Sequence, residues 1–524
     1  MRRWNGWGDE SVTLELPESA LSYLYEQLGR GKPPPDASFE SVTHAAPPSR
    51  LPPHPLIDAT PAARVLHARG QSLPDWFALR FGRLDTLPDG VAFPESSHDV
   101  RELLTFALAC GARVIPYGGG TSVVGHLTPP AGPEPVLSVS LARMRALLEI
   151  DRPSRLATFG AGVTGPDLEA QLRGHGFTLG HFPQSFEYST LGGWIVTRSS
   201  GQQSLRYGRI ERLLAGARVE TPAGTLQIPT IPASAAGIDV RELLLGSEGR
   251  LGIVTEATIR VRSLPERESF HGVFFSQWDR AEQAAREIAH AGVPLSMVRL
   301  SNAAETMTTL RMAGGTALLE RYLALRGARD ERCLMVLGAT GSAQECEAML
   351  AAARAIASAH RGVWIGRRIG SRWQHNRFRG VYFRNALWEH GYAVDTVETA
   401  VDWPRVATMM RDLEAAGRGA FGGEPIHAYT HLSHVYPQGS SVYSTFVFRI
   451  APTYEENVER WTRFKRRLCE AIVANGGTIS HQHGVGLDHK PYLVAEKGEL
   501  GIDAMRALLL RFDPSGMMNP GKLC

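Results

Sequence analysis

The first group of residues that could do chemistry is a glycine-rich stretch near the start of the chain. Residues 114–125 (VIPYGGGTSVVG) place three consecutive glycines and two hydroxyl side chains directly after a short apolar run. Glycines allow positive φ and leave backbone N–H groups unobstructed, so successive amides can converge on phosphate oxygens. The stretch therefore predicts a cradle for a diphosphate, with an ordinary tight turn as the alternative.

Two later stretches have the same character. Residues 181–201 (HFPQSFEYSTLGGWIVTRSSG) and 246–254 (GSEGRLGIV) are rich in hydrogen-bond donors and broken by glycine. Three such loops in one region suggest one large ligand touched along its length. Three independent surface turns remain the simpler alternative.

Further chemistry is suggested by histidines and an arginine in the second half of the chain. His481 and His483 stand two residues apart before a glycine, so on a strand their side chains would share a face and point into a pocket. Arg384 offers a planar fork suited to phosphate, or alternatively a surface ion pair beside Glu389. His427, His431 and His434 lack the glutamate of an H-E-x-x-H zinc motif.

The surrounding periodicity predicts the elements that position these residues. A helix capped by Ser97 and ending at Gly111 should precede a strand at 112–116, with further strands at 136–141 and 156–160 and a capping-box-like helix start at Thr164. From residue 266 a second α+β unit follows. Its expected strands are 270–275, 295–300, 334–337, 363–365 and 442–450, and its expected helices are 279–291, 342–360 and 403–416.

The flanking segments have their own signatures. Trp4 and Trp7 suit an aromatic plug, residues 32–61 read as a Pro-rich surface linker, and a helix is expected at 454–475. Residues 310–326 mix apolar and cationic side chains, which fits a mobile lid, an interfacial helix or an amphipathic helix on the core.

Composition narrows the class of protein. Lys and Arg number 56 against 53 Asp and Glu, which argues against nucleic acid as the main partner. Five scattered cysteines without C-x-x-C spacing indicate a reducing compartment. No segment resembles a signal peptide, and no apolar run approaches the ~18 residues of a spanning helix. We expect a cytoplasmic protein.

Taken together, PYGGGTS (116–122), QSFEYST (184–190), TRSS (197–200), EGRLGIV (248–254), HQHGVG (481–486) and FDPSGMMNPGK (512–522) resemble the vanillyl-alcohol-oxidase-type (PCMH-type) FAD-linked oxidases. Within that superfamily RWNGWGD, the 180–201 block and the C-terminal histidines look most like the alkyldihydroxyacetonephosphate synthases. The resemblance implies an α+β fold with a two-subdomain FAD-binding domain, an α+β cap domain with an antiparallel sheet, and a C-terminal helical segment. The implied boundaries are 1–85 for a helical linker segment, 86–265 for the FAD domain, 266–452 for the cap and 453–524 for the C-terminal segment.

The resemblance also implies the cofactor contacts. They are Pro116, Tyr117, Gly118, Gly119, Gly120, Thr121, Ser122, Gln184, Ser185, Phe186, Glu187, Tyr188, Ser189, Thr190, Thr197, Arg198, Ser199, Ser200, Glu248, Gly249, Arg250, Leu251, Gly252, Ile253 and Val254. Some members of the family attach the flavin to a histidine or cysteine. Because the first loop holds Tyr117 and glycines, we expect non-covalent FAD.

The catalytic residues carried over from the family are Tyr443 for proton transfer, Arg384 for the substrate phosphate, Arg299, and the outer residues His481 and His483 of a His-His-His motif. Gln482 replaces the middle histidine. A tyrosine with an ordinary pKa of ~10 is a poor base near neutrality, so its phenolate needs nearby cations or hydrogen bonds, for which the two histidines are candidates.

The implied activity is exchange of the acyl group of acyl-dihydroxyacetone phosphate for a fatty alcohol in ether-lipid synthesis, without net oxidation. The alternative is a metal-free FAD-dependent 2-hydroxyacid oxidase or dehydrogenase of the glycolate or D-lactate type. Many of those relatives bind a metal through H-x-G-D-G-N-x-H, whereas residues 434–443 read HVYPQGSSVY. We expect no catalytic metal, a small-molecule or lipid substrate bearing phosphate or carboxylate, and no nucleic acid. Peripheral membrane contact and a homodimer stay open.

Overall fold

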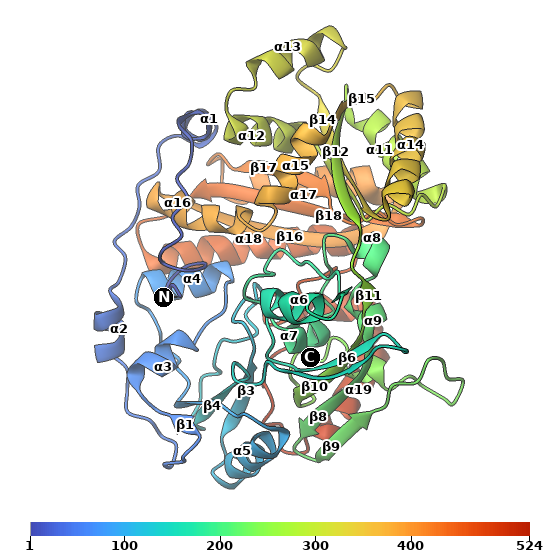
Figure 1. Cartoon of the computed structure of the whole chain (residues 1–524). Helices are drawn as coiled ribbons and strands as arrows, with labels where there is room; N and C mark the ends of the chain where they lie inside the picture. Colours follow the sequence, from blue (N-terminus) through green and yellow to red (C-terminus); the bar gives the residue numbers. More distant parts are fainter. Residues whose placement is uncertain (1) are drawn as a thin grey trace.

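The computed structural model describes residues 2–524. The chain forms two halves, with the cyan and green part in the lower half of Figure 1 and the orange and yellow sheet with its helices above it. Blue N-terminal segments run along one side of both halves (Figure 1). This is the α+β arrangement that the sequence predicts.

The lower half contains two sheets. The first has the order β1-β2-β4-β3, in which β2, β4 and β3 are parallel and β1 is antiparallel; the second is antiparallel with the order β5-β6-β10-β8-β9. Their strands are β1 (Ile57–Asp58), β2 (Gly90–Ala92), β3 (Arg113–Tyr117), β4 (Val136–Ser140), β5 (Leu147–Asp151), β6 (Leu156–Gly160), β8 (Leu214–Thr221), β9 (Gly224–Ile228) and β10 (Ile253–Arg260). A small pair joins β7 (Phe177–Thr178) to β11 (Arg262–Ser263).

The helices in this half differ in how their N-termini are capped. They are α3 (Pro61–Leu66), α4 (Leu73–Arg80), α5 (Ser97–Ala109), α6 (Gly165–Arg173), α7 (Leu191–Val196), α8 (Ser204–Tyr207), α9 (Ile210–Leu213) and α10 (Arg241–Leu244). Ser96, not Ser97, caps α5, because its side chain and that of Asp99 form a reciprocal capping box. At α6 the expected capping box is absent, since Thr164 makes no side-chain cap hydrogen bond.

The upper half is built on one antiparallel sheet of seven strands with the order β15-β12-β14-β13-β17-β18-β16. The strands are β12 (Arg267–Phe275), β13 (Met297–Ser301), β14 (Cys333–Gly341), β15 (Val363–Gly366), β16 (Tyr392–Asp402), β17 (His427–Leu432) and β18 (Gly439–Arg449). The sequence did not predict β16 or β17.

Helices pack on this sheet and complete the half. They are α11 (Trp278–His290), α12 (Ala303–Ala313), α13 (Ala317–Leu325), α14 (Ala343–Ala359), α15 (Arg367–Asn376), η1 (Gly380–Tyr382), α16 (Phe383–Glu389) and α17 (Trp403–Arg418). The expected helix at 342–360 begins as predicted at the N-cap Ser342, which forms a capping box with Glu345.

The C-terminal helical segment consists of α18 (Tyr454–Ala474), η2 (Lys490–Tyr492) and α19 (Leu493–Phe512). After α19 the chain returns to β3: Val114 donates its N–H to the Met517 carbonyl at 2.9 Å, and Asn519 donates to the Val114 carbonyl at 2.7 Å. The strand that leads into the glycine loop is therefore paired on this side by residues from the far end of the chain.

The N-terminal segments include α1 (Glu18–Leu28) and, inside the predicted linker, α2 (Phe39–His44). Trp7 is buried, as expected for an aromatic plug, and its ring meets Tyr188 edge-on with centroids 5.7 Å apart. Among residues 2–524 we find no helix whose length and apolar character would suffice to cross a bilayer.

Candidate active site

The four loops predicted to hold the cofactor meet at one place in the lower half. A Cβ at Gly119 would lie 1.7 Å from the Tyr188 carbonyl oxygen, so only glycine lets the first loop approach the second so closely. Glu248 donates its N–H to the Val196 carbonyl at 2.9 Å, which joins the fourth loop to the end of α7. Sequence-distant loops are thus assembled around one region.

A polar chain links the first and fourth loops to the C-terminal segment. The Ser122 hydroxyl lies 2.7 Å from His126 Nδ1, and His126 Nε2 lies 2.9 Å from Glu248 Oε2. The same carboxylate accepts the backbone N–H groups of Val485 at 2.5 Å and Gly486 at 2.9 Å. Glu248 has a positive φ of 53°, a left-handed conformation that places this carboxylate against both partners.

The donor set of these loops fits a nucleotide cofactor. Buried polar atoms without a protein partner among the described residues include the hydroxyls of Ser200 and Ser247 and the Nε of Arg250. Unpaired buried donors are costly, so they indicate a ligand that accepts hydrogen bonds. Ser200 and Arg250 belong to the predicted set of FAD contacts, and these residues are suited to phosphate or ribose oxygens.

Several predicted cofactor residues use their side chains elsewhere. The Gln184 amide donates to the Arg377 carbonyl at 2.7 Å, Phe186 stacks on Phe378 at 4.9 Å, and Glu187 accepts from the Tyr382 hydroxyl at 2.9 Å. This loop therefore also ties the lower half to residues 377–382 of the cap.

Two arginines of the predicted set also have contacts outside these loops. Arg198 pairs with Glu242 and donates to the Leu245 carbonyl, and Arg250 lines a separate cavity of about 380 Å³ with Arg113 and Glu134. The structure leaves the assignment of these individual residues to FAD as a prediction.

The predicted catalytic tyrosine lies in a row of side chains that crosses the upper sheet. The strand register places Ser301, His431, Tyr443 and Glu398 opposite one another on β13, β17, β18 and β16. Directly opposite residues of antiparallel strands share a face, with Cβ atoms ~4.5–5.5 Å apart. The His431 ring stacks on the Tyr443 ring with centroids 4.8 Å apart, so these two neighbours in the row are in direct contact.

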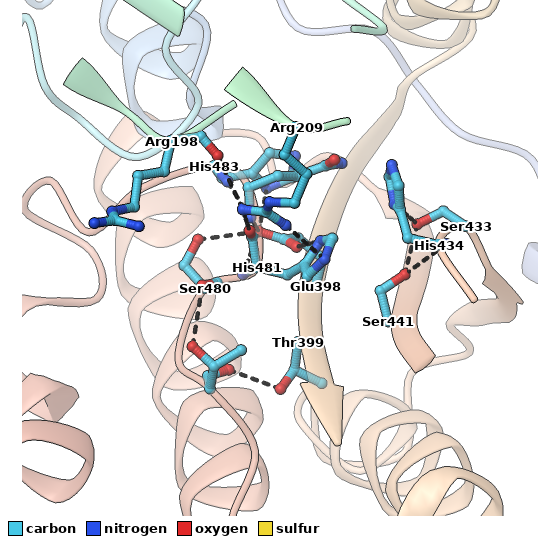
Figure 2. A network of polar contacts seen from close by, with 12 residues as sticks. Arg198, Arg209, Glu398, Thr399, Ser433, His434, Ser441, Ser480, His481 and His483 are labelled. Carbon is cyan, nitrogen blue, oxygen red and sulfur yellow. Dashed lines mark hydrogen bonds and ion pairs between the residues drawn. The ribbon is translucent and has the colours of Figure 1, made fainter. Parts of the chain in front are cut away.

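Glu398, which lies opposite Tyr443 in the strand register, is the centre of the polar network in Figure 2. Its Oε1 accepts the Ser480 hydroxyl at 3.0 Å and the backbone N–H groups of His481, Gln482 and His483 at 3.0, 2.8 and 2.9 Å. Burial alone would raise the pKa of this carboxyl, but His483, His481 and the loop amides outweigh it and hold the pKa well below its ordinary value. Glu398 therefore stays ionised and fixes the histidine loop.

The two predicted histidines have different surroundings. His481 Nε2 lies 2.8 Å from Arg209 Nη1 (Figure 2). It also lies 2.7 Å from the Tyr436 hydroxyl. Because a guanidinium only donates, this nitrogen is an acceptor and His481 carries its proton on Nδ1, 3.5 Å from Glu398 Oε2. His481 is thus held through Nε2, while its buried Nδ1 has no hydrogen-bond partner among the described residues.

His483, in contrast, meets Tyr443 edge-on with ring centroids 5.7 Å apart. Its Nδ1 lies 3.7 Å from Glu398 Oε1, and its side chain retains 18% exposure. Burial lowers the pKa of both histidines, with Glu398 opposing the shift. The role of the two histidines toward the Tyr443 phenolate, as cations or through hydrogen bonds, stays a prediction.

The expected strand at 481–483 is also absent, because these residues form a loop gathered around one carboxylate. Gln482 uses its backbone N–H for that contact, so the change from histidine to glutamine preserves the loop's attachment.

Arg299 and Arg384 supply positive charge near Tyr443. Burial raises the pKa of the Tyr443 phenol, Thr396 and Arg299 oppose the shift, and Glu398 reinforces it. Arg299 lies on β13 and donates to Glu305 at 2.8 Å and to His431 Nδ1 at 3.0 Å. Burial would raise the pKa of Glu305, yet His431 and Arg299 lower it to about 2. Arg299 thus joins the row through His431.

Arg384 lies on α16. Its Nη1 donates a hydrogen bond to the Gln71 carbonyl at 2.8 Å, and its guanidinium lies over the Trp76 ring at 4.3 Å. Burial lowers its pKa to about 10, while Asp395 and Tyr443 oppose that shift. It is therefore a buried, charged group within electrostatic reach of Tyr443, not a surface ion pair with Glu389.

Sequence reasoning missed Glu398, Arg209, Tyr436 and the stacking role of His431. None of the four stands in a recognisable motif, and Glu398 becomes a site residue only through its register with Tyr443. One weak signal exists: an acid inside the β-branched run TVETAV favours a buried partner for the carboxylate.

Comparisons with known proteins agree with this architecture. A family model described as FAD binding domain matches residues 88–228, and one described as FAD linked oxidases, C-terminal domain, matches residues 264–523. The chain is 30% identical to an alkyldihydroxyacetonephosphate synthase of Dictyostelium discoideum over 99% of this chain and 93% of that protein. It is 30% identical to the same enzyme of Trypanosoma brucei brucei, over 99% and 92%.

A solved structure of an alkyldihydroxyacetonephosphate synthase superposes with a TM-score of 0.87 at 28% identity, covering 100% of this chain and 99% of that one. FAD is accordingly the cofactor of this enzyme. By its full-length similarity, its two matched domains and its fold, the chain belongs to the alkyldihydroxyacetonephosphate synthase family of FAD-linked enzymes.

Proposed function

We propose that this enzyme exchanges the acyl group of acyl-dihydroxyacetone phosphate for a fatty alcohol, giving an ether-linked product without net oxidation. The observation that carries the proposal is the buried row on the upper sheet, in which Tyr443 lies between His431 and Glu398 with His483 edge-on to its ring. Membership of the family supports the same activity.

Each residue has a defined task in this proposal. Tyr443 removes the proton from the carbon next to the ketone, and Arg384 and Arg299 supply positive charge for the substrate phosphate and for the developing phenolate. His483 retains an exposed edge, so it can accept or return a proton. When bound, FAD supplies the electron sink for the reacting carbon.

The decisive test is an anaerobic assay with acyl-dihydroxyacetone phosphate and a long-chain alcohol. Formation of an ether product and release of a fatty acid without flavin bleaching supports the proposal. Bleaching by a 2-hydroxyacid, without ether formation, would favour the oxidase or dehydrogenase alternative.

We also propose that the FAD is held non-covalently. The Tyr117 side chain is buried, and its hydroxyl faces the Leu66 carbonyl at 3.4 Å. Acid precipitation should release yellow flavin into the supernatant; flavin that stays in the pellet would contradict the proposal.

A cytoplasmic location with peripheral membrane contact through α13 is proposed as well. This helix lies at the top of Figure 1, and Leu318 and Leu325 on it are 81% and 87% exposed beside Arg321 and Arg326. Apolar side chains flanked by arginines suit an anionic bilayer surface. Sedimentation with anionic vesicles should be lost in Leu318→Ser/Leu325→Ser and kept in Leu500→Ser, whose side chain is 84% exposed on α19. Equal losses would refute a role for α13.

A further inference from the structure

The N-terminal segment, residues 2–12, is not used by the site described so far. It folds back on itself, because the backbones of Arg2 and Asp9 form an isolated antiparallel β-bridge and the Arg3 N–H donates to the Gly8 carbonyl at 2.8 Å. A Cβ at Gly8, whose φ is +85°, would lie 2.1 Å from the Tyr382 ring, so this turn fits against the cap only with glycine.

The segment is anchored to both halves of the molecule. Asn385 accepts the Trp7 N–H at 3.1 Å and donates to the Trp7 carbonyl at 2.9 Å, while Arg80 donates to the Asn5 carbonyl at 2.7 Å. The N-terminus accordingly lies beside α4, at the junction of the two halves (Figure 1). This anchoring fixes the positions of the arginines that precede Trp7.

Those arginines line a cavity of about 220 Å³. Arg2 and Arg3 form one wall together with Arg69, and Tyr117 and Gly118 of the glycine loop form another. No carboxylate lines the cavity among the described residues. A cavity of this charge, bounded by a glycine-rich loop, is suited to an anion.

The lack of carboxylate partners for Arg2 and Arg3 also favours an anionic ligand. Across residues 2–524 neither Arg2 nor Arg3 has a carboxylate at ion-pair distance, and the buried Arg3 Nε has no hydrogen-bond partner. Arg2 instead lies over the Tyr188 ring at 5.4 Å. Both side chains are half-buried, and Arg3 Nη2 donates to the Glu10 and Val12 carbonyls at 3.4 and 3.3 Å. The two guanidiniums therefore line the cavity without a counter-charge, which an anionic ligand would supply.

We propose that Arg2 and Arg3 close over the diphosphate of FAD, opposite the amides of the glycine loop, and that the N-terminal segment is a clamp for the cofactor. Two planar forks on one side and backbone N–H groups on the other would neutralise both phosphates. The proposal rests on the FAD cofactor and is independent of the acyl-exchange reaction.

The test uses Arg2→Gln and Arg3→Gln, with Arg83→Gln as the matched control. The Arg83 side chain is 50% exposed, pairs with Glu455 and lies over the Tyr454 ring, away from the cavity. The flavin is stripped from each protein, and FAD or riboflavin is titrated back by fluorescence. Each clamp variant should bind FAD about 10- to 100-fold more weakly, since hydrogen bonds to charged groups are worth ~1.5–3 kcal/mol. Riboflavin, which has no phosphate, should bind all four proteins equally.

Unchanged FAD affinity in both clamp variants would overturn the proposal. An equal loss for riboflavin would overturn it too, because the arginines would then act through the fold. A third arm titrates the holoenzymes with glycerol 3-phosphate: a loss there with intact FAD affinity would assign the cavity to a substrate phosphate and refute the clamp. Synthase turnover is not needed for any of these readouts, so failure of the clamp and failure of the proposed activity are distinguishable.

Discussion

Replacing Glu398 by glutamine tests whether one carboxylate holds the catalytic loop in place. Its Oε1 accepts four donors from residues 480–483 at 2.8–3.0 Å, and the residue is 1% exposed. Each of these hydrogen bonds would lose about 1 kcal/mol when the acceptor loses its charge. Because one oxygen serves all four donors, the four losses do not add in full. We expect the free energy of unfolding to fall by about 2–3 kcal/mol in total.

The effect on turnover should be larger than this loss of stability suggests. His483 is placed against Tyr443 through this loop, and a displacement of ~1 Å at a reacting group costs about 100-fold in rate. We therefore expect kcat for ether formation to fall about 100-fold in Glu398→Gln, while FAD binding is retained. Glu398→Asp, which keeps the charge, should recover part of the loss.

The matched control is Glu414→Gln. Glu414 is also buried, and it accepts hydrogen bonds from the Asn302 amide at 2.8 Å and the Thr430 hydroxyl at 2.7 Å. Thr430, however, lies on the face of β17 opposite to His431, away from the row that contains Tyr443. Urea unfolding should show a comparable loss of stability with unchanged kcat. The reasoning is refuted if Glu398→Gln keeps wild-type kcat, or if both variants lose activity in proportion to their stability.

The remaining predictions concern single residues and pH. Tyr443→Phe should retain FAD and lose at least about 100-fold in kcat, the usual range for a general base, and a fully active variant would remove Tyr443 from the mechanism. Arg384→Lys should raise KM for acyl-dihydroxyacetone phosphate about 10- to 100-fold with unchanged flavin content; an unchanged KM would place the phosphate elsewhere. Burial lowers the pKa of His427 to about 4 and that of His181 to about 3, so their stabilising contribution is complete above the unfolded value near 6.5 and is lost as pH falls below it. At pH 5 this amounts to about 2 kcal/mol for each histidine, and Tm should drop between pH 7.5 and 5; a flat profile would contradict it.

Much of the fold could be read from local patterns. The periodicity predicted α5, α11, α14, α17 and α18 to within two residues, because each combines an amphipathic stripe with a capping residue or a glycine stop. The strands β16 and β17 were missed because each carries titratable side chains that a sequence pattern places on the surface. Glu398 on β16 and His427 and His431 on β17 are buried only in the assembled sheet.

The site shows the same division between local and distant information. The motif resemblance located Tyr443, His483 and the loops, since these lie in characteristic stretches. Glu398 and Arg209 escaped notice because their contacts with the histidine loop join residues far apart in the sequence: those with His481 span 83 and 272 residues. The pattern H-x-H suggested a strand, whereas a single buried carboxylate bends these residues into a loop.

The pairing of β3 with the segment after α19 bears on the order in which the molecule matures. The Arg113 side chain reaches the Gly516 carbonyl, 403 residues later, and Val114 exchanges backbone hydrogen bonds with Met517 and Asn519. During synthesis the sheet that leads into the glycine loop is therefore incomplete until residues 516–519 have been made. Stable capture of flavin should come only after that point, so that chains that stop short of these residues are left without their cofactor and are open to proteolysis.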